Sequence, residues 1–286
     1  MKILITNDDG YRAKGIQVLV NILKRYGEIT VVAPKYVQSG ASMGVTMGYR
    51  PIAVKKVREE PGVVWYYLDG SPASCVKFGI GNLYTDGLPD LLVSGINHGG
   101  NYATAALYSG TLGAAQEGAL VKVPSVAVSL DSLDPDADFS VVERYLPPIF
   151  EKMAWHPSRR FGLTYNINFP AVPPEEVAGV RVCKQGVIRW VRELYPYDPG
   201  IYERKGIDHR EIGITSLPEP DPESDEMYYV MGGEIVKDPD NSEETDVELI
   251  ARKYITVTAH SILTTDQREQ RRLRSIGLEE ILNPKA

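Results

Sequence analysis

The sequence has few residues of the kinds that form disulfides or bind soft metals. Its 286 residues include two cysteines, Cys75 and Cys183, both in apolar surroundings, and four histidines. We therefore expect buried free thiols, and a disulfide-linked scaffold is not indicated. The histidines are scattered along the chain and give no support to a Ser-His-Asp triad: His98, His156, His209 and His260.

Long hydrophobic runs and an excess of positive charge are also missing. Ile3-Leu4-Ile5 is too short for the apolar core of a signal peptide, and no segment could span a bilayer. We expect a cytoplasmic protein with no membrane partner. Lys and Arg number 31 against 38 Asp and Glu, for a net charge of −7. This balance argues against a nucleic-acid polymer as partner, although a bound metal would still allow a small anionic substrate.

The acidic excess belongs to one segment. Residues 217–246 contain eleven acidic residues and a single base, Lys237, for a net charge of −10. The other 256 residues therefore sum to +3. We expect the segment to be a solvated excursion or arm, with residues 217–244 exposed and mobile, because so many like charges resist burial.

Apolar periodicity near the N-terminus predicts a parallel sheet. Lys2 to Thr6 is a short β-branched run typical of a buried strand, and residues 15–26 repeat apolar side chains at helical spacing. Another apolar run covers residues 29–33 and stops at Pro34. Strand, helix and strand within 35 residues form a βαβ unit, whose crossover is right-handed.

The same alternation continues to about residue 183. Further strands are predicted at 90–96, 125–129 and 161–169, helices at 74–80, 112–120 and 139–153, and a hairpin or extension at 50–58 and 63–69. The prediction is a Rossmann-like α/β core, 1–183, with a doubly wound, mostly parallel sheet.

After residue 183 the pattern of long apolar runs ends, and Gly, Pro and Tyr interrupt short ones. We expect residues 184–244 to form an extended β-rich arm. Residues 245–286 should supply a strand at 254–258 and a basic helix at 266–275 that return to the core or to a partner. An arm that buries little surface in its own subunit is expected to exchange with another, which predicts a homodimer or homotetramer.

Polar side chains follow the predicted parallel strands at the edge of the sheet where ligands bind. Asp8 and Asp9 follow the first strand, Ser39 follows the second, and Asn97 follows the strand at 90–96. Adjacent carboxylates repel each other unless a cation neutralises them. An oxygen-only set without His or Cys favours one Mg²⁺ or Mn²⁺ per subunit. The alternative is a plain turn with a helix cap, which the second polar strand end makes less attractive.

A phosphate site is predicted beside the metal. Ser109-Gly110-Thr111 precedes a helix of small residues, and backbone N–H groups at a helix N-terminus bind anions. Asn101, on the glycine-rich loop after Asn97, could reach the same phosphate. Taken alone, an ordinary Ser or Thr helix cap explains the motif as well.

Several motifs together resemble the SurE survival-protein family of nucleotidases: Met1 to Gly10, Val93 to Asn101, Tyr108 to Thr111 followed by Gly113 to Ala115, Leu68 to Ala73 and Asn166 to Pro170. The resemblance covers about residues 1–183. It implies a metal-dependent phosphomonoesterase of nucleoside monophosphates, with domain-exchanged oligomers. Its metal ligands would be Asp8, Asp9, Ser39 and Asn97, and its phosphate contacts Asn101, Ser109, Gly110 and Thr111. The chain departs from the family at Ala259-His260, where Pro-Leu is typical.

Other readings of the paired carboxylates are less well supported. A signalling receiver domain needs an acceptor Asp where this chain has Gly95-Ile96-Asn97, and a haloacid dehalogenase-like phosphatase needs a second Asp two positions after Asp8, where Gly10 stands. A non-catalytic nucleotide-binding module would have no need of all four metal ligands. Within the nucleotidase reading, Asp8 could orient or deprotonate a water or attack directly. The base, the 5′ or 3′ position and activity on polyphosphate stay open.

Overall fold

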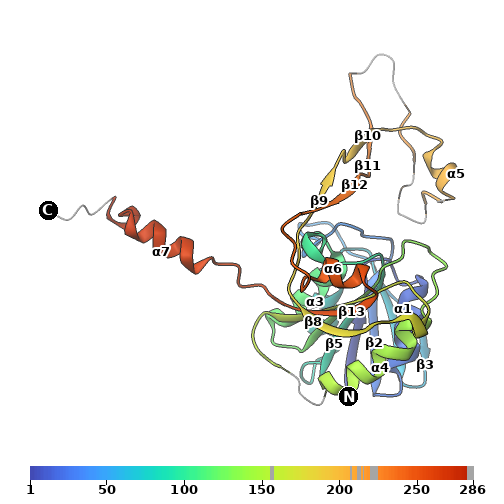
Figure 1. Ribbon diagram of the computed structural model, residues 1–286. Helices are drawn as coiled ribbons and strands as arrows, with labels where there is room; N and C mark the ends of the chain where they lie inside the picture. Colours follow the sequence, from blue (N-terminus) through green and yellow to red (C-terminus); the bar gives the residue numbers. More distant parts are fainter. Residues whose placement is uncertain (155–157, 207, 211–213, 215, 220–224, 282–286) are drawn as a thin grey trace.

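The computed structural model describes residues 1–154, 158–206, 208–210, 214, 216–219 and 225–281. Its body is one nine-stranded sheet, in the order β3-β4-β2-β1-β5-β6-β7-β13-β8, with helices on both faces (Figure 1). The predicted α/β fold with a mostly parallel sheet is confirmed. The first seven strands are β1 (Lys2–Thr6), β2 (Glu28–Pro34), β3 (Val54–Glu60), β4 (Val63–Leu68), β5 (Leu91–His98), β6 (Ser125–Leu130) and β7 (Leu163–Phe169).

Strand β1 lies where the direction of winding reverses. It pairs in parallel with β2 on one side and with β5 on the other. From β1 the chain moves outward through β2 to the β3–β4 hairpin, and then returns to β5 on the opposite side. The loops after β1 and β5 therefore leave neighbouring strands at the point where the winding reverses, which is where ligands bind in doubly wound folds.

Each face of the sheet carries two of the four core helices. Helices α1 (Lys14–Leu23) and α4 (Ser140–Ala154) share a core with one face, and α2 (Pro72–Phe78) lies with α3 (Gly110–Leu120) on the other. Ile16 and Leu19 of α1 are fully buried, and burying each such side chain contributes about 1.5–3 kcal/mol. Within the described part of the chain, no helix is both long enough and apolar enough to cross a membrane.

A strand from the C-terminal region completes the sheet. Strand β13 (Tyr254–Ser261) is inserted between β7, with which it runs antiparallel, and β8 (Gly179–Cys183), with which it runs parallel. Periodicity did not predict β8, since most of its side chains are exposed at the edge of the sheet. The predicted strand at 254–258 returns to its own subunit's core.

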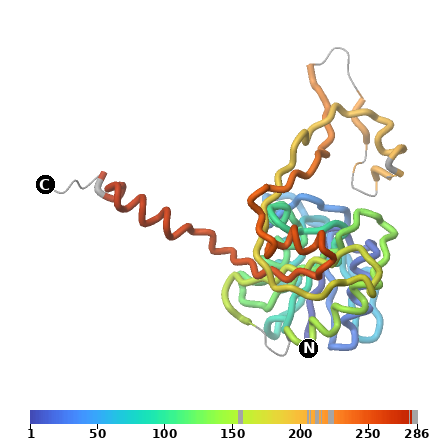
Figure 2. Tube along the Cα trace, viewed as in Figure 1, coloured from blue at the N-terminus to red at the C-terminus, as the bar shows by residue number. Residues whose placement is uncertain are grey.

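Between β8 and β13 the chain leaves the body as a narrow arm, visible in orange at the top of Figure 2. Two antiparallel pairs build it, β9 (Ile188–Val191) with β12 (Glu234–Lys237) and β10 (Leu194–Pro196) with β11 (Tyr229–Met231), and α5 (Ile201–Lys205) lies beyond them. After β13, helix α7 (Gln267–Ser275) extends away from the body in another direction (Figure 1). None of the residues in α7 is buried.

The acidic segment is more structured than its charge suggested. Its residues 229–231 and 234–237 form the returning strands of the arm, and residues 220–224 lie outside the described residues. Asp246, which opens helix α6 (Asp246–Ala251), is fully buried. The expectation of a solvated segment is therefore wrong for Asp246. Charge density predicts exposure only where no folded partner supplies hydrogen bonds to the carboxylate.

Strand β5 changes its register at Gly95. Its pairing with β6 shifts between Ser94 and Asn97, and Gly95 has a φ of +137°. A Cβ at this position would lie 2.2 Å from the backbone oxygen of Val128. Only glycine fits both the dihedral angle and the close approach, and the shift brings Asn97 to the end of the strand.

Replacing Gly95 should therefore destabilise the protein. We expect Gly95→Ala to lower the free energy of unfolding by about 3 kcal/mol, from the strained φ and the displaced strand. Urea denaturation measures the change. Gly81→Ala is the matched control, because a Cβ at Gly81 meets nothing within 4 Å. Equal stability of the two variants would contradict this account of the β5 register.

Candidate metal and phosphate site

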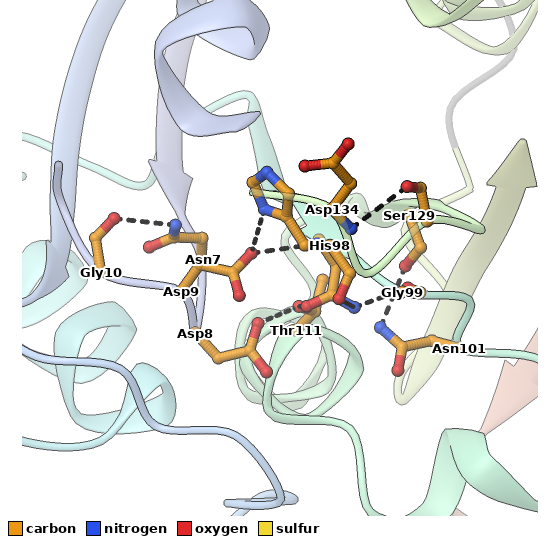
Figure 3. A network of polar contacts seen from close by, with 12 residues as sticks. Asn7, Asp8, Asp9, Gly10, His98, Gly99, Asn101, Thr111, Ser129 and Asp134 are labelled. Atoms are coloured by element: carbon orange, nitrogen blue, oxygen red, sulfur yellow. Dashed lines mark hydrogen bonds and ion pairs between the residues drawn. The ribbon is translucent and has the colours of Figure 1, made fainter. Parts of the chain in front are cut away.

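The site begins at the carboxyl end of β1, where Asp8 and Asp9 stand side by side (Figure 3). Asp8 is buried, with 5% of its surface exposed. Burial and then the charge of Asp9 raise the pKa of Asp8 to about 7. A negative charge on Asp8 in addition to the charge on Asp9 is therefore costly when no cation is bound. A bound cation would remove this cost, which is the physical test that a metal site has to meet.

Helix α3 begins against the first of these carboxylates. The hydroxyl of Thr111 donates to Asp8 Oδ1. The hydroxyl oxygen of Thr111 also lies 3.2 Å from Asn97 Oδ1. A Cβ on Gly110 would lie 2.9 Å from both Cβ and Oδ2 of Asp8. The first turn of α3 therefore touches Asp8, and this contact is open only to glycine at position 110.

The amide of Asn97 is oriented by its backbone neighbours. Its Nδ2 donates to the carbonyl oxygens of Gly99, at 2.6 Å, and His98, at 3.2 Å. The amide oxygen then faces the hydroxyl of Thr111, 3.2 Å away. One hydroxyl hydrogen then faces two acceptor oxygens, which leaves the cluster short of positive charge. Oxygen donors of this kind suit a hard divalent cation such as Mg²⁺ or Mn²⁺.

The second carboxylate is held by His98. Asp9 Oδ2 accepts the backbone N–H of His98 at 3.1 Å, and the ring nitrogen Nδ1 lies 3.2 Å from the same oxygen. The imidazole packs edge-on against Phe139, with 5.3 Å between ring centroids. Since an ionised carboxylate can only accept, we assign a proton to Nδ1 of His98, which then donates to Asp9 Oδ2. The His98 side chain is only 13% exposed, so it points into the protein and toward Asp9.

Ser39 is the one predicted ligand without a hydrogen bond to this cluster. It is exposed on the loop after β2. The preceding residue anchors that loop, since the backbone N–H of Gln38 donates to the carbonyl oxygen of Asp8 at 2.7 Å. The structure therefore attaches the loop of Ser39 to Asp8 and leaves its hydroxyl open to solvent.

Asn101 is held by hydrogen bonds to residues of strands β6 and β7. Its backbone N–H donates to Asn168 Oδ1 at 2.7 Å, and its carbonyl accepts from Asn166 Nδ2 at 2.6 Å. Its own Nδ2 donates to the hydroxyl of Ser129 at 3.0 Å. Sequence reasoning gave these three supporting residues no role. The signal it could have used is the spacing of Asn166 and Asn168, which puts both on one face of a strand.

Ser109 caps helix α3, since its Oγ accepts the backbone N–H of Leu112 at 3.0 Å. The capping role that the motif allowed is thus present. The helix that Ser109 caps presents its positive end at Asp8 through Gly110 and Thr111, and an anion is stabilised at such an end.

The other two histidines that the structure describes lie away from this cluster. His209 lies in the arm after α5, His260 lies on β13, and His156 is outside the described residues. No three His, Cys, Asp or Glu side chains gather at a metal-binding distance anywhere in the described ranges. A metal here would depend on two carboxylates and neutral oxygens, as the sequence predicted.

The fold and site define a class: an α/β protein with an acidic, oxygen-rich cluster and a helix N-terminus at its switch point. Residues 3–192 match the family model described as survival protein SurE. The chain belongs to the SurE family, which confirms the resemblance.

Similar proteins extend over nearly the whole chain. The 5′-nucleotidase SurE of Synechococcus elongatus is 38% identical over 90% of this chain and 92% of its own length. The 5′-nucleotidase SurE of Syntrophomonas wolfei is 34% identical over 93% and 90%. The crystal structure of the SurE protein from Aquifex aeolicus superposes with a TM-score of 0.74 at 26% identity, covering 97% of this chain and 100% of that one.

The hydroxyl of Thr111 should matter for binding a cation. Thr111→Val keeps the side chain's shape and removes the donor to Asp8, so we expect Mn²⁺ to bind about tenfold more weakly, as when other ligand-orienting partners are lost. Thr111→Ser keeps the hydroxyl and should bind as the wild type does. Calorimetric titration of the apoprotein measures both. Unchanged Mn²⁺ affinity in Thr111→Val would contradict this role.

Proposed function

We propose that the protein is a divalent-metal-dependent 5′-nucleotidase, which hydrolyses nucleoside monophosphates to nucleoside and phosphate. The observation that carries the proposal is the gathering of acceptor oxygens from Asp8 and Asn97 at the N-terminus of α3. Relatives that share 34–38% of their residues with this chain over about 90% of its length are named 5′-nucleotidases. The substrates to be assayed for this proposal include 3′-nucleotides and polyphosphate.

The predicted ligands fit a single Mg²⁺ or Mn²⁺. Asp8, Asp9 and Asn97 would hold it, with the hydroxyl of Ser39 completing the protein's share. A cation held there supplies positive charge to a phosphate oxygen and makes a nearby water more acidic. The other residues act on the substrate: Asn101, Thr111 and the first turn of α3 from Ser109 and Gly110 would bind the phosphate oxygens and stabilise their developing charge.

The two carboxylates would have different duties. Asp9 Oδ2 already accepts from two nitrogens of His98, which fixes its orientation. Asp8 is held by one hydroxyl. We therefore assign to Asp8 the contact with the attacking group, as the base that orients a water or as the nucleophile itself, and to Asp9 the role of a fixed ligand.

Phosphate release from a panel of nucleoside monophosphates, with and without Mg²⁺ or Mn²⁺, tests the function. Asp8→Asn should remain folded and lose activity by about a hundredfold, because a neutral amide neither holds the cation nor serves as base or nucleophile. Asp86→Asn makes the same change on an exposed loop and should keep full activity. Turnover near the wild-type rate in Asp8→Asn, or metal-independent turnover in the wild type, would refute the proposal.

The arm is proposed to join subunits. Its described strands expose large apolar side chains on a segment that projects from the body (Figure 1), among them Leu194, 60% exposed, and Met231, 77% exposed. These two are cross-strand partners in the β10–β11 pair. An exposed apolar surface of this kind is unfavourable in water, and in homo-oligomers it is usually buried against a symmetry-related subunit. A homodimer or homotetramer with arms exchanged between subunits would supply it.

Sedimentation velocity of the intact chain should therefore show a dimer or tetramer. The double variant Leu194→Glu and Met231→Glu places two like charges opposite each other on the arm. It should shift the protein toward monomer, because both carboxylates would be buried in the interface. Leu88→Glu, on the body, is the control and should leave the assembly unchanged. A monomeric wild type would contradict exchange of the arm.

A further inference from the structure

The base of the arm contains a buried carboxylate that the proposed chemistry does not use. Asp246, at the start of α6, has no exposed surface. Its two oxygens accept three backbone N–H groups from three separate segments. Oδ2 accepts from Ala103 at 2.9 Å, and Oδ1 accepts from Gly186 and Val247, both at 2.8 Å. One side chain thus joins the loop after Asn101 to the beginning of the arm and to α6.

Ala103 is an unusual residue to be held in this way. It is fully buried and has a φ of +51°, in the left-handed region that a residue with a Cβ avoids. Both of its backbone polar groups bind the arm base, because its carbonyl also accepts from Gln185 Nε2 at 3.1 Å. The strained conformation of Ala103 is therefore maintained by hydrogen bonds to Asp246 and Gln185, which lie outside the segment of residues 101–107.

The next residue makes the same connection. The backbone N–H of Ile188 donates to Thr104 Oγ1 at 3.1 Å, and the Thr104 hydroxyl donates to the carbonyl oxygen of Ile188. Beneath these bonds, Ala103, Ile188 and Val247 form a small apolar cluster. The loop and the first strand of the arm are consequently packed as one unit.

Asp246 has no cationic partner among the described residues. His260 is the ionisable base that interacts with it, and burial lowers the pKa of His260, so the ring is neutral at pH 7. Burial also raises the pKa of Asp246, and the three N–H groups oppose that shift. The carboxylate is thus stabilised mainly by the backbone groups that it ties together.

We propose that Asp246 is a positioning residue that fixes the loop of residues 101–107 to the arm base and so makes phosphate binding depend on how the arm is attached. The inference rests on the proposed role of Asn101 as a phosphate contact. Asn101 stands two residues before Ala103 and is also held by Asn166, Asn168 and Ser129. A loop released at Ala103 would therefore lose the support on one side of Asn101 and loosen its amide, while Asp8 and Asp9 stay in position.

Asp246→Asn tests this with almost no change of shape. An amide has one acceptor oxygen, which is best placed where Asp246 Oδ1 serves Gly186 and Val247. Its NH₂ group would then face the N–H of Ala103, donor against donor. The substitution therefore removes the hydrogen bond from the Ala103 N–H and keeps those from Gly186 and Val247. Asp240→Asn is the matched control, because Asp240 belongs to the same acidic segment and is exposed.

We expect Asp246→Asn to raise both KM and the inhibition constant of inorganic phosphate by about tenfold, the effect of one buried donor left unpaired. The dissociation constant for Mn²⁺ should stay within about twofold of wild type. Hydrogen exchange followed by mass spectrometry should show faster exchange in a peptide covering residues 101–107. Asp240→Asn should match the wild type in every measurement. Thr104→Val, which removes both bonds to Ile188, should move the same quantities in the same direction and serves if Asp246→Asn does not fold.

A purely structural role predicts a different result. Asp246→Asn would then melt at a lower temperature, while KM, phosphate inhibition and exchange of the 101–107 peptide in the folded protein stayed at wild-type values. That outcome would overturn the inference. A wild-type protein that releases no phosphate from any nucleotide would instead refute the proposed function. The exchange measurement needs no turnover, so unchanged exchange in Asp246→Asn would overturn the loop attachment in that case too.

Discussion

Two neighbouring carboxylates at the end of one buried strand are the constraint on which the rest of this site depends. Asp8 and Asp9 repel each other, and burial makes the charge on Asp8 more costly still. The surrounding chain supplies only part of what they need. Thr111 donates one hydrogen to Asp8, and His98 donates to Asp9 through its backbone and its ring. The remaining requirement is positive charge, which explains why the proposed chemistry needs a divalent cation.

Around this pair, the protein uses buried polar groups to fix the segment that runs from Asn101 into the 3-10 helix Ala103–Leu107. Asn166, Asn168 and Ser129 hold Asn101 from the sheet, and Asp246 holds Ala103 from the arm. Such networks are costly when half satisfied and rigid when complete. All of these groups bind the short segment that contains Asn101 and Ala103. This concentration indicates that a fixed geometry of the segment matters more than its flexibility.

Local patterns in the sequence predicted most of the core. Strand β1 and helices α1 and α3 were placed to within three residues at each end, because apolar periodicity records directly which side is buried. The clustering of Asp8 with Asn97 followed from parallel-strand topology alone. Three features could not be predicted in this way. The edge strand β8 lacks a buried face, the insertion of β13 is a pairing between distant segments, and the burial of Asp246 depends on donors more than fifty residues away.

The place of β13 in the sheet also sets an order for assembly. Strand β8 is made before the arm, yet it joins the sheet only through β13, which is made after it. During synthesis, β8 and the outer edge of β7 must therefore stay unpaired until residues 254–261 have been added. The two ends of the arm then meet at the bridge between Lys184 and Thr245. Closing the sheet and fastening the arm are consequently a single late step, and a nascent chain stopped before residue 254 would expose a strand edge open to association with other chains.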